Sequence, residues 1–386
     1  MKPTIKLYDA HTIDRLPWPD TEDGEYARRY LEPLVKQGTD VFIANVLTSF
    51  RVLLVDDIVL PVTVNEREYG NAYVCSPYTH YVTYAKQELV MLNSPLLERV
   101  LKPVLDTIGL LLKASRINKV VHVNNWLLST NLYPALSAEQ LEAATLFLAR
   151  SFPRHAVVFR SVNGFTDRTL PGTFRNMGFT LAASRQIYLL DPADPSFMNS
   201  KARWLLKRDH ALIAKNGYNE VQADELLPED MPRIRELYND LYLGKYSADN
   251  PQFTERFFRL TLERRTLNLT ALRHRETGRI DAVLGYFYRN GVMTTPVFGY
   301  DTKLSLETGL YRMLSAMLIR IASENGRVLN ESSGAAQFKR NRGAVAEMEY
   351  SAVYTRHLPF YRRLCWSFLA GVANGIGVPL MVRKKL

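Results

Sequence analysis

The chain has 386 residues, of which 47% are hydrophobic and 23% charged. This globular balance supplies enough apolar material for two cores and excludes an intrinsically disordered protein. The formal net charge of +10 indicates an anionic partner but does not choose between phosphate, carboxylate, acidic lipid and RNA. Cys75 and Cys365 form no metal-binding pattern, and the N-terminal sequence lacks the apolar core of a signal peptide. We therefore expect a cytoplasmic protein of two domains.

The first half predicts a mixture of strands and helices. β-branched residues on both sides of Asp56 and Asp57 predict a hairpin. Helical spacing of apolar residues after Ser94 predicts a helix, and Ser137 with Gln140 resembles a capping box before another. Strands are expected in the segments 50–65, 71–85, 119–123 and 155–162.

A segment rich in proline and aspartate, residues 190–197, predicts a boundary. Beyond it we expect a helix over 200–216, a helix near 231–242, an antiparallel meander over 268–301, a helix over 310–325 and a strand from Val328. Because strands, helix and strand recur in the same order, the two halves are predicted to share one architecture. The predicted domains cover residues 1–195 and 196–356.

Residues 357–386 form a third, basic and apolar segment that we expect to be helical. From Arg356 to the C-terminus there are six Lys or Arg and no acid, and the 19 residues LCWSFLAGVANGIGVPLMV are uncharged. Three glycines, a proline and an asparagine in this run argue against a membrane span. A helix that covers the core or lies at a membrane surface, with basic flanks, is the expected role.

The stretch NESSGAAQFKRNRGA, from Asn330 to Ala344, places an acid, two serines and three cations directly after an apolar strand. Together with SKARWLLKRDHALIAKNGYNEV and GRIDAVLGYF, it resembles the tandem branch of the GNAT acyltransferases. That branch includes the Fem-type peptidoglycan aminoacyltransferases and proteins with a cellulose-biosynthesis-like acetyltransferase domain. The match covers residues 200–355. It implies an α/β fold of two tandem GNAT-like domains, each a mainly antiparallel mixed sheet flanked by helices, with the donor site in the C-terminal one.

In the family that this sequence resembles, a central strand precedes a helix whose N-terminus binds phosphate, and the next strand splays away to admit the donor's pantetheine arm. Here the corresponding stretch, KLSLETGLYRML, has a single glycine, Gly309, where relatives that bind acetyl-CoA carry more. Its backbone N–H groups still suit a phosphate at a helix start. Lys339 stands where the family usually has tyrosine. The donor is therefore left open between an acyl-CoA, a carrier-protein thioester and an aminoacyl-tRNA.

Acyl transfer to an amine needs a base for the proton and donors for the developing oxyanion. Glu331 is the candidate base, and Ser332 and Ser333 are candidates to hold the thioester carbonyl or the pantetheine amides. Lys339 and Arg342 are expected to bind donor phosphates or a substrate carboxylate. An ion pair of Glu331 with Arg340 or Arg342 that only fixes the loop is the structural alternative.

Further polar and aromatic residues are candidates to line the pocket. They are Tyr246, Gln252, Phe253, Thr294, Thr295 and Tyr300. His80 and His122 are weaker candidates for an acid or base, and Cys75 for a nucleophile, because no Cys-His-Asp arrangement surrounds them.

The sequence thus predicts a transferase that moves an acyl group from a thioester to an amine by direct attack. Its acceptor would be a small or medium-sized molecule. We expect no tightly bound cofactor and no metal, with acyl-CoA or an acyl carrier protein as donor and membrane contact through 357–386. The alternatives are a Fem-type transferase that uses aminoacyl-tRNA, although the family's coiled-coil arm is not apparent, and a non-catalytic module that binds RNA or acidic lipid. A nucleic-acid partner is expected only in these alternatives, as the aminoacyl-tRNA or the bound RNA.

Overall fold

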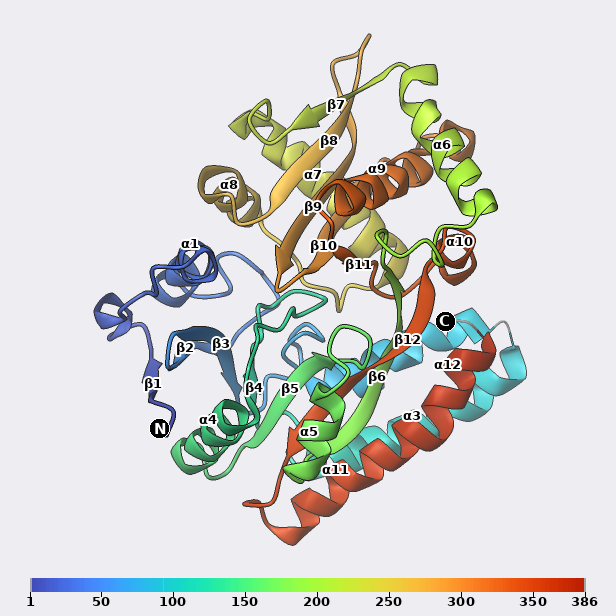
Figure 1. The fold of residues 1–386 in the computed structure, drawn as a ribbon. Helices are drawn as coiled ribbons and strands as arrows, with labels where there is room; N and C mark the ends of the chain where they lie inside the picture. Colours follow the sequence, from blue (N-terminus) through green and yellow to red (C-terminus); the bar gives the residue numbers. More distant parts are fainter. Residues whose placement is uncertain (1, 93, 385–386) are drawn as a thin grey trace. The chain divides into compact units, whose positions relative to one another are not determined.

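The computed structural model describes residues 2–92 and 94–384, drawn in Figure 1. The chain forms two compact units, and it passes between them more than once. The first unit contains residues 1–186, 249–251 and 347–386, and the second contains residues 187–248 and 252–346. Each unit is a mainly antiparallel sheet flanked by helices, so the expected α/β class is confirmed.

Seven strands form the sheet of the first unit, in the order β1-β2-β3-β4-β5-β12-β6. Their bounds are β1 (Ile5–Tyr8), β2 (Ser49–Val55), β3 (Ile58–Asn65), β4 (Val120–Val123), β5 (Ala156–Val162), β6 (Thr180–Leu190) and β12 (Val345–Tyr354). The predicted hairpin is confirmed, because β2 and β3 pair antiparallel up to Val55 opposite Ile58. Strands β4 and β5 pair in parallel. Strands β6 and β12 were not expected, and each extends past the limit of the unit at one end.

Helices cover this sheet on both faces. They are α1 (Glu22–Gln37), α2 (Ala85–Glu88), α3 (Pro95–Ala114), α4 (Ala138–Ser151), α5 (Leu170–Asn176), α11 (Phe360–Val372) and α12 (Val378–Lys384), with short turns η1 (Ile13–Arg15), η2 (Thr79–Tyr84), η3 (Leu89–Leu92) and η7 (Ala373–Gly377). The capping box of α4 is confirmed, because Ser137 and Gln140 bond each other's backbone N–H groups.

The strand-rich segment predicted over residues 71–85 is wrong, since residues 73–75 form a turn and residues 77–85 are helical. Ser76 Oγ accepts a hydrogen bond from the Thr79 backbone N–H at 3.1 Å, and Asn118 Oδ1 accepts one from the Tyr78 N–H at 2.9 Å. These side chains satisfy the first donors of a helical turn, so tertiary contacts override the strand preference of Tyr, Val and Thr.

The second unit is built on the order β6-β11-β10-β9-β8-β7. Its strands are the end of β6, β7 (Tyr218–Gln222), β8 (Asn268–His274), β9 (Ile280–Arg289), β10 (Val292–Tyr300) and β11 (Val328–Asn330). Its helices are α6 (Ser200–Lys215), α7 (Met231–Asn239), α8 (Glu255–Arg264), α9 (Leu310–Glu324) and α10 (Ala336–Arg340), with turns η4 (Pro228–Asp230), η5 (Asp240–Tyr246) and η6 (Leu306–Thr308). The predicted meander is confirmed in β8, β9 and β10, which pair antiparallel.

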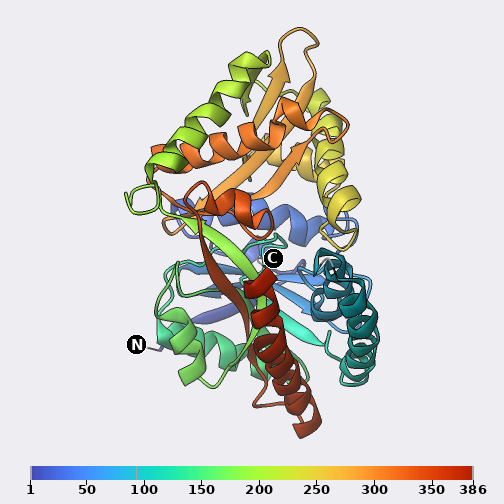
Figure 2. The ribbon, with the colours of Figure 1, turned by 90° about the vertical axis from the view of Figure 1, so that its right-hand side faces the viewer.

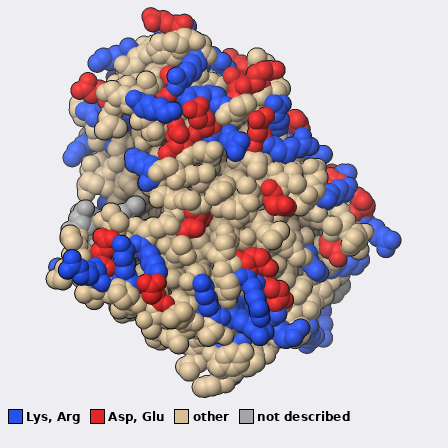
Figure 3. All heavy atoms as spheres, turned by 180° about the vertical axis from the view of Figure 1, so that it is seen from behind, with Lys and Arg blue, Asp and Glu red and all other residues tan. Residues whose placement is uncertain are grey.

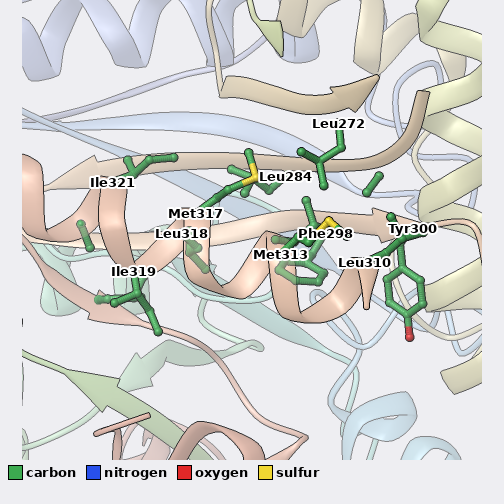
Figure 4. Close-up of a cluster of buried hydrophobic side chains, with 14 of the residues drawn as sticks. Leu272, Leu284, Phe298, Tyr300, Leu310, Met313, Met317, Leu318, Ile319 and Ile321 are labelled. Carbon is green, nitrogen blue, oxygen red and sulfur yellow. The ribbon is translucent and has the colours of Figure 1, made fainter. Parts of the chain in front are cut away.

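The core of the second unit lies between α9 and the meander. Met313 and Met317 of α9 are fully buried and point toward Leu284 of β9 and Phe298 of β10 (Figure 4). Met side chains fill irregular gaps between a helix and a twisted sheet. This packing fixes the start of α9 beside the end of β10.

Helix α7 packs its backbone directly on β10 at Gly299. A Cβ atom added there would lie 2.7 Å from the carbonyl carbon of Leu237 and 2.8 Å from the Tyr238 nitrogen. Because backbone cannot yield as a side-chain end can, we expect Gly299→Ala to lower the free energy of unfolding by about 1–3 kcal/mol. Urea unfolding followed by circular dichroism measures this. In the control Gly244→Ala the nearest atom, Asn239 O, lies 3.7 Å away, and an equal loss in both variants would contradict the packing argument.

Candidate active site

The candidate site lies in the second unit, where β10 and β11 part. The two strands pair in parallel only from Val292 opposite Val328 to Thr294 opposite Asn330. Strand β11 ends there, while β10 continues to Tyr300. The pairing of these two strands therefore ends at Asn330, at the level of Thr294.

The two threonines predicted to line a pocket are buried and shape this divergence. Thr294 Oγ1 donates to the Asn330 carbonyl oxygen at 3.1 Å. Thr295 Oγ1 lies 3.1 Å from the Gly285 carbonyl oxygen and 2.9 Å from that of Val297, where the register of β10 against β9 shifts. Both hydroxyls bond backbone carbonyl oxygens, so the two threonines stabilise the strands next to the site.

The loop after β11 is wound tightly by left-handed residues. Ser332 has φ of 59°, Gly334 of 80° and Ala335 of 49°. The Glu331 N–H donates to the Tyr188 carbonyl oxygen at 2.9 Å, and the Tyr188 N–H donates to that of Ser332 at 3.1 Å. These bonds anchor the loop to the end of β6 and leave the side chains of Ser332 and Ser333 partly exposed.

Lys339 of α10 stabilises this loop through hydrogen bonds to its backbone. Its buried ammonium donates to the backbone carbonyl oxygens of Glu331 at 2.6 Å, Ser332 at 3.3 Å and Ser333 at 2.9 Å. A lysine ammonium has three N–H donors, so three carbonyls occupy them. These hydrogen bonds fix the conformation of the loop that carries Glu331.

Glu331 itself is buried, with 7% of its surface exposed, and its Oε1 atom has no hydrogen-bond partner. Among residues 2–92 and 94–384, no cation lies within 4.0 Å of its carboxylate, so the ion pair weighed in the sequence is not formed. Burial raises the pKa of the Glu331 carboxyl above its ordinary value, while the charges of Lys339 and Arg342 act in the opposite direction. A carboxylate in this setting is a stronger base than one in water.

Arg342 is held by an acid that the sequence analysis did not select. Its Nε donates to Asp209 Oδ2 at 2.9 Å, and its Nη1 donates to the Phe338 carbonyl oxygen at 3.1 Å. Asp209 lies on α6, is fully buried, and also accepts from Arg312 Nε of α9 at 2.7 Å. One carboxylate thus connects α6, α9 and the segment after α10.

Aromatic side chains cluster around Tyr311, which interacts electrostatically with Glu331. The ring of Tyr311, in the first turn of α9, lies 4.8 Å from Phe338, 5.3 Å from Phe298 and 6.1 Å from Tyr300. Burial, followed by the charge of Glu331, raises the pKa of the Tyr311 hydroxyl well above its ordinary value. Tyr311 therefore stays protonated and lies electrostatically close to Glu331.

The predicted tyrosines lie at the same end of the unit. The Tyr300 hydroxyl accepts from Lys245 Nζ at 3.4 Å, and Tyr246 is 38% exposed. Burial raises the pKa of the Tyr246 hydroxyl, while Lys245 lowers it. Figure 4 draws Tyr300 beside Leu310, at the start of α9.

Gly309 precedes α9 with φ of 74°, a conformation that favours glycine. A Cβ atom there would lie 2.8 Å from Leu212 Cδ1 of α6, so a side chain would also disturb the packing of the two helices. The first backbone N–H groups of α9 have no intrahelical acceptor, and they carry the positive end of the helix dipole.

The other candidate residues from the sequence make contacts that support the fold. Phe253 is buried and stacks on Phe257 at 4.0 Å, and Gln252 Nε2 donates to the Ala248 carbonyl oxygen. His122 and Cys75 are buried in the first unit, and His80 of the same unit is half-buried. Burial lowers the pKa of His80 to about 3 and raises the pKa of Cys75 to about 12, which leaves a neutral imidazole and an unreactive thiol. Within the described part of the chain, no three His, Cys, Asp or Glu side chains are grouped to hold a metal ion.

Two residues of the site, Asp209 and Tyr311, were missed. Asp209 occupies the apolar stripe of α6 between Leu205 and Ile213, and a lone carboxylate at a stripe position was the available signal. For Tyr311 the only signal in the sequence was its position two residues after Gly309.

Comparison with known proteins yields structural likenesses only. No family model and no curated protein matches the chain. The fold is similar to L-PGS from Bacillus licheniformis, at 16% identity, over 61% of this chain and 78% of that one, with a TM-score of 0.44. The C-terminal domain of a putative lysylphosphatidylglycerol synthetase from Agrobacterium fabrum gives 13% identity, 62% and 81% coverage and a TM-score of 0.45. FemX gives 10% identity, 59% and 80% coverage and a TM-score of 0.45. At these identities the likenesses concern the fold alone.

Proposed function

We propose that the protein transfers an acyl group from a thioester to an amine of a small or medium-sized acceptor, by direct attack and without an acyl-enzyme. The thioester is an acyl-CoA or an acyl carrier protein, and no tightly bound cofactor is required. One observation carries the proposal: the buried carboxylate of Glu331 has an oxygen without a partner at the point where β10 and β11 part. A buried carboxylate oxygen without a hydrogen bond is costly, and such groups concentrate at functional sites.

In this route the amine nitrogen attacks the thioester carbonyl carbon, the C–S bond breaks, and the thiol leaves. Glu331 accepts the proton that the amine loses, directly or through one water, and passes it to the departing thiolate. The Tyr311 hydroxyl, kept protonated by its surroundings, donates to the oxyanion or to the leaving sulfur. The partly exposed serines after Glu331 hold the thioester carbonyl or the pantetheine amides.

The contacts of Lys339 and Arg342 change the roles expected from the sequence. Lys339 positions Glu331 through the loop, and Arg342 positions α10 through Asp209. The donor phosphates are then bound by the backbone N–H groups after Gly309.

The pH dependence of kcat/KM tests the role of Glu331 as base. Because the pKa of the buried carboxyl is raised above its ordinary value of 4.5, we expect activity to fall as the pH decreases through that raised pKa. In Glu331→Gln this acidic limb should disappear, since glutamine does not titrate. If the variant's pH profile keeps its acidic limb at the same pH, another group is responsible for that limb.

One observation favours the aminoacyl-tRNA alternative. Trp204 of α6 is 59% exposed and Arg208 stacks over it at 4.7 Å, while Lys201, Lys207 and Lys215 are exposed on the same helix. Exposed aromatic rings among cations suit the bases and phosphates of a nucleic acid. Native mass spectrometry with acyl-CoAs, acyl carrier proteins and tRNA separates the donors. Binding of tRNA alone, weakened in Trp204→Ala, would replace the thioester by an aminoacyl ester. Binding of RNA or acidic lipid without any transfer would favour the non-catalytic module.

A further inference from the structure

The C-terminal helical segment of the first unit leaves most of its apolar side chains in solvent. Residues Phe360–Arg383, spanning α11, η7 and α12, form the one helix of the described chain that is long and apolar enough to cross a membrane, although it is mostly exposed. Six large apolar side chains are between 44% and 72% exposed: Phe360, Tyr361, Leu364, Phe368, Ile376 and Val382. Exposed apolar area on this scale marks an interaction surface.

The opposite face of this segment is fixed to the first unit. The Arg362 guanidinium donates to the backbone carbonyl oxygens of Ser115, Arg116 and Lys119 at 3.1 Å. Asn374 Nδ2 donates to the Leu181 carbonyl oxygen at 2.8 Å. Between these anchors Trp366, Leu369 and Ala370 are buried, and together with Arg362 they form one helical stripe. The helix therefore lies along the unit with one face docked and the other bare.

Helix α3 presents a second bare apolar face in the same unit. Its stripe is buried only near the C-terminal end, at Ile108 and Leu112. Toward the N-terminal end the stripe is uncovered, with Leu97 at 38%, Val100 at 55% and Val104 at 47% exposure. Leu96, Leu110 and Leu111 are also exposed.

The two helical segments adjoin. Just beyond the C-terminal end of α3, Ser115 Oγ donates to Cys365 Sγ of α11 at 2.9 Å. Figure 1 draws α3 beside α11 and α12, and Figure 2 shows them on the side turned toward the viewer. We call the bare faces of α3, α11 and α12 the helical face.

The charges around the helical face are basic. Arg363 and Arg383 are exposed on α11 and α12, and no acid follows Arg356 in the sequence. The two acids of α3, Glu98 and Asp106, are paired with lysines. Elsewhere the charges are mixed: Figure 3 shows basic and acidic side chains interspersed over the face drawn there. Positive charge that flanks an apolar helix face complements an anionic bilayer surface.

We propose that the helical face docks the protein in the plane of an anionic lipid bilayer. The apolar side chains enter the boundary between head groups and acyl chains, and the arginines contact lipid phosphates. The anchors of Arg362 and Asn374 hold the segment against the unit, which excludes insertion across the bilayer while these bonds persist. The inference is independent of the proposed transferase activity.

Cosedimentation of the full chain with vesicles of phosphatidylcholine and phosphatidylglycerol, against pure phosphatidylcholine, tests the inference. We expect binding to the anionic vesicles that weakens with salt. Arg363→Glu with Arg383→Glu should weaken it by about 25-fold or more, since each basic residue near an anionic surface contributes about fivefold. Leu364→Asp with Phe368→Asp should weaken it by about tenfold or more, because buried apolar area sets binding strength. Leu227→Asp, at an exposed leucine of the second unit, should bind as the wild type does.

Three results would overturn the proposal. Equal binding by the wild type and by both double variants would place the contact elsewhere. Resistance of the bound protein to alkaline carbonate extraction would show a span. Absence of vesicle binding, together with a dimer in analytical ultracentrifugation that the Leu364 and Phe368 substitutions dissociate, would assign the face to a second copy of the chain.

Discussion

Replacing Glu331 by glutamine is expected to lower turnover by about 10²–10⁴-fold, the usual contribution of a single general base. Glutamine keeps the shape of the side chain and loses only its basicity. Because the loop is held by Lys339 through backbone carbonyls, its conformation should not depend on the charge of residue 331. Donor binding, measured by titration with the thioester, should therefore change little.

The matched control is Glu276→Gln, an exposed carboxylate in the turn between β8 and β9 of the same unit. It should retain wild-type turnover. If Glu331→Gln also retains it, Glu331 is not the base. If donor binding falls in parallel with turnover, Glu331 instead belongs to the binding surface.

Replacing Asp209 by asparagine is expected to cost about 3–5 kcal/mol of unfolding free energy, the usual loss when one partner of a buried ion pair is removed. The side chain of Arg342 is only 5% exposed, so its charge would stay buried without compensation. Arg312 would lose the same partner. Urea unfolding followed by circular dichroism measures the loss.

Asp224→Asn, at an exposed acid of the same unit, should leave the unfolding midpoint nearly unchanged. A small effect of Asp209→Asn, within about 0.5 kcal/mol as for ordinary surface substitutions, would contradict the bridging role of Asp209. The double variant Asp209→Asn with Arg342→Met should recover part of the loss, because the uncompensated buried charge is gone.

Much of the second unit could be predicted because its signals are local. The Asn290-Gly291 turn, with φ of 48° and 78°, marks the meander, and the apolar stripe of α9 marks the crossover helix. Strands β6 and β12 escaped prediction because each mixes polar and apolar residues and depends on partners far along the chain. The segment near Thr79 has strand-like residues but a helical conformation, imposed by Ser76 and Asn118.

The candidate site was predictable in part for the same reason. Glu331 and its serines could be found in the sequence, because a polar run directly follows an apolar strand. The contacts of Lys339 and Arg342 could not, because a cation's partner depends on which carbonyl or acid the fold brings near. Asp209, more than a hundred residues before Arg342, shows that dependence.

Detection of the product is the strongest test of thioester-dependent amide formation at Glu331. Wild-type protein, Glu331→Gln and Glu276→Gln would each be incubated with a pool of acyl-CoAs or acyl carrier proteins and a pool of amines, and analysed by mass spectrometry. We expect an amide and one equivalent of free thiol with the wild type and Glu276→Gln, and at least about a hundredfold less of both with Glu331→Gln. The same yield from all three proteins, or an acyl group left covalently on the protein, would contradict this expectation.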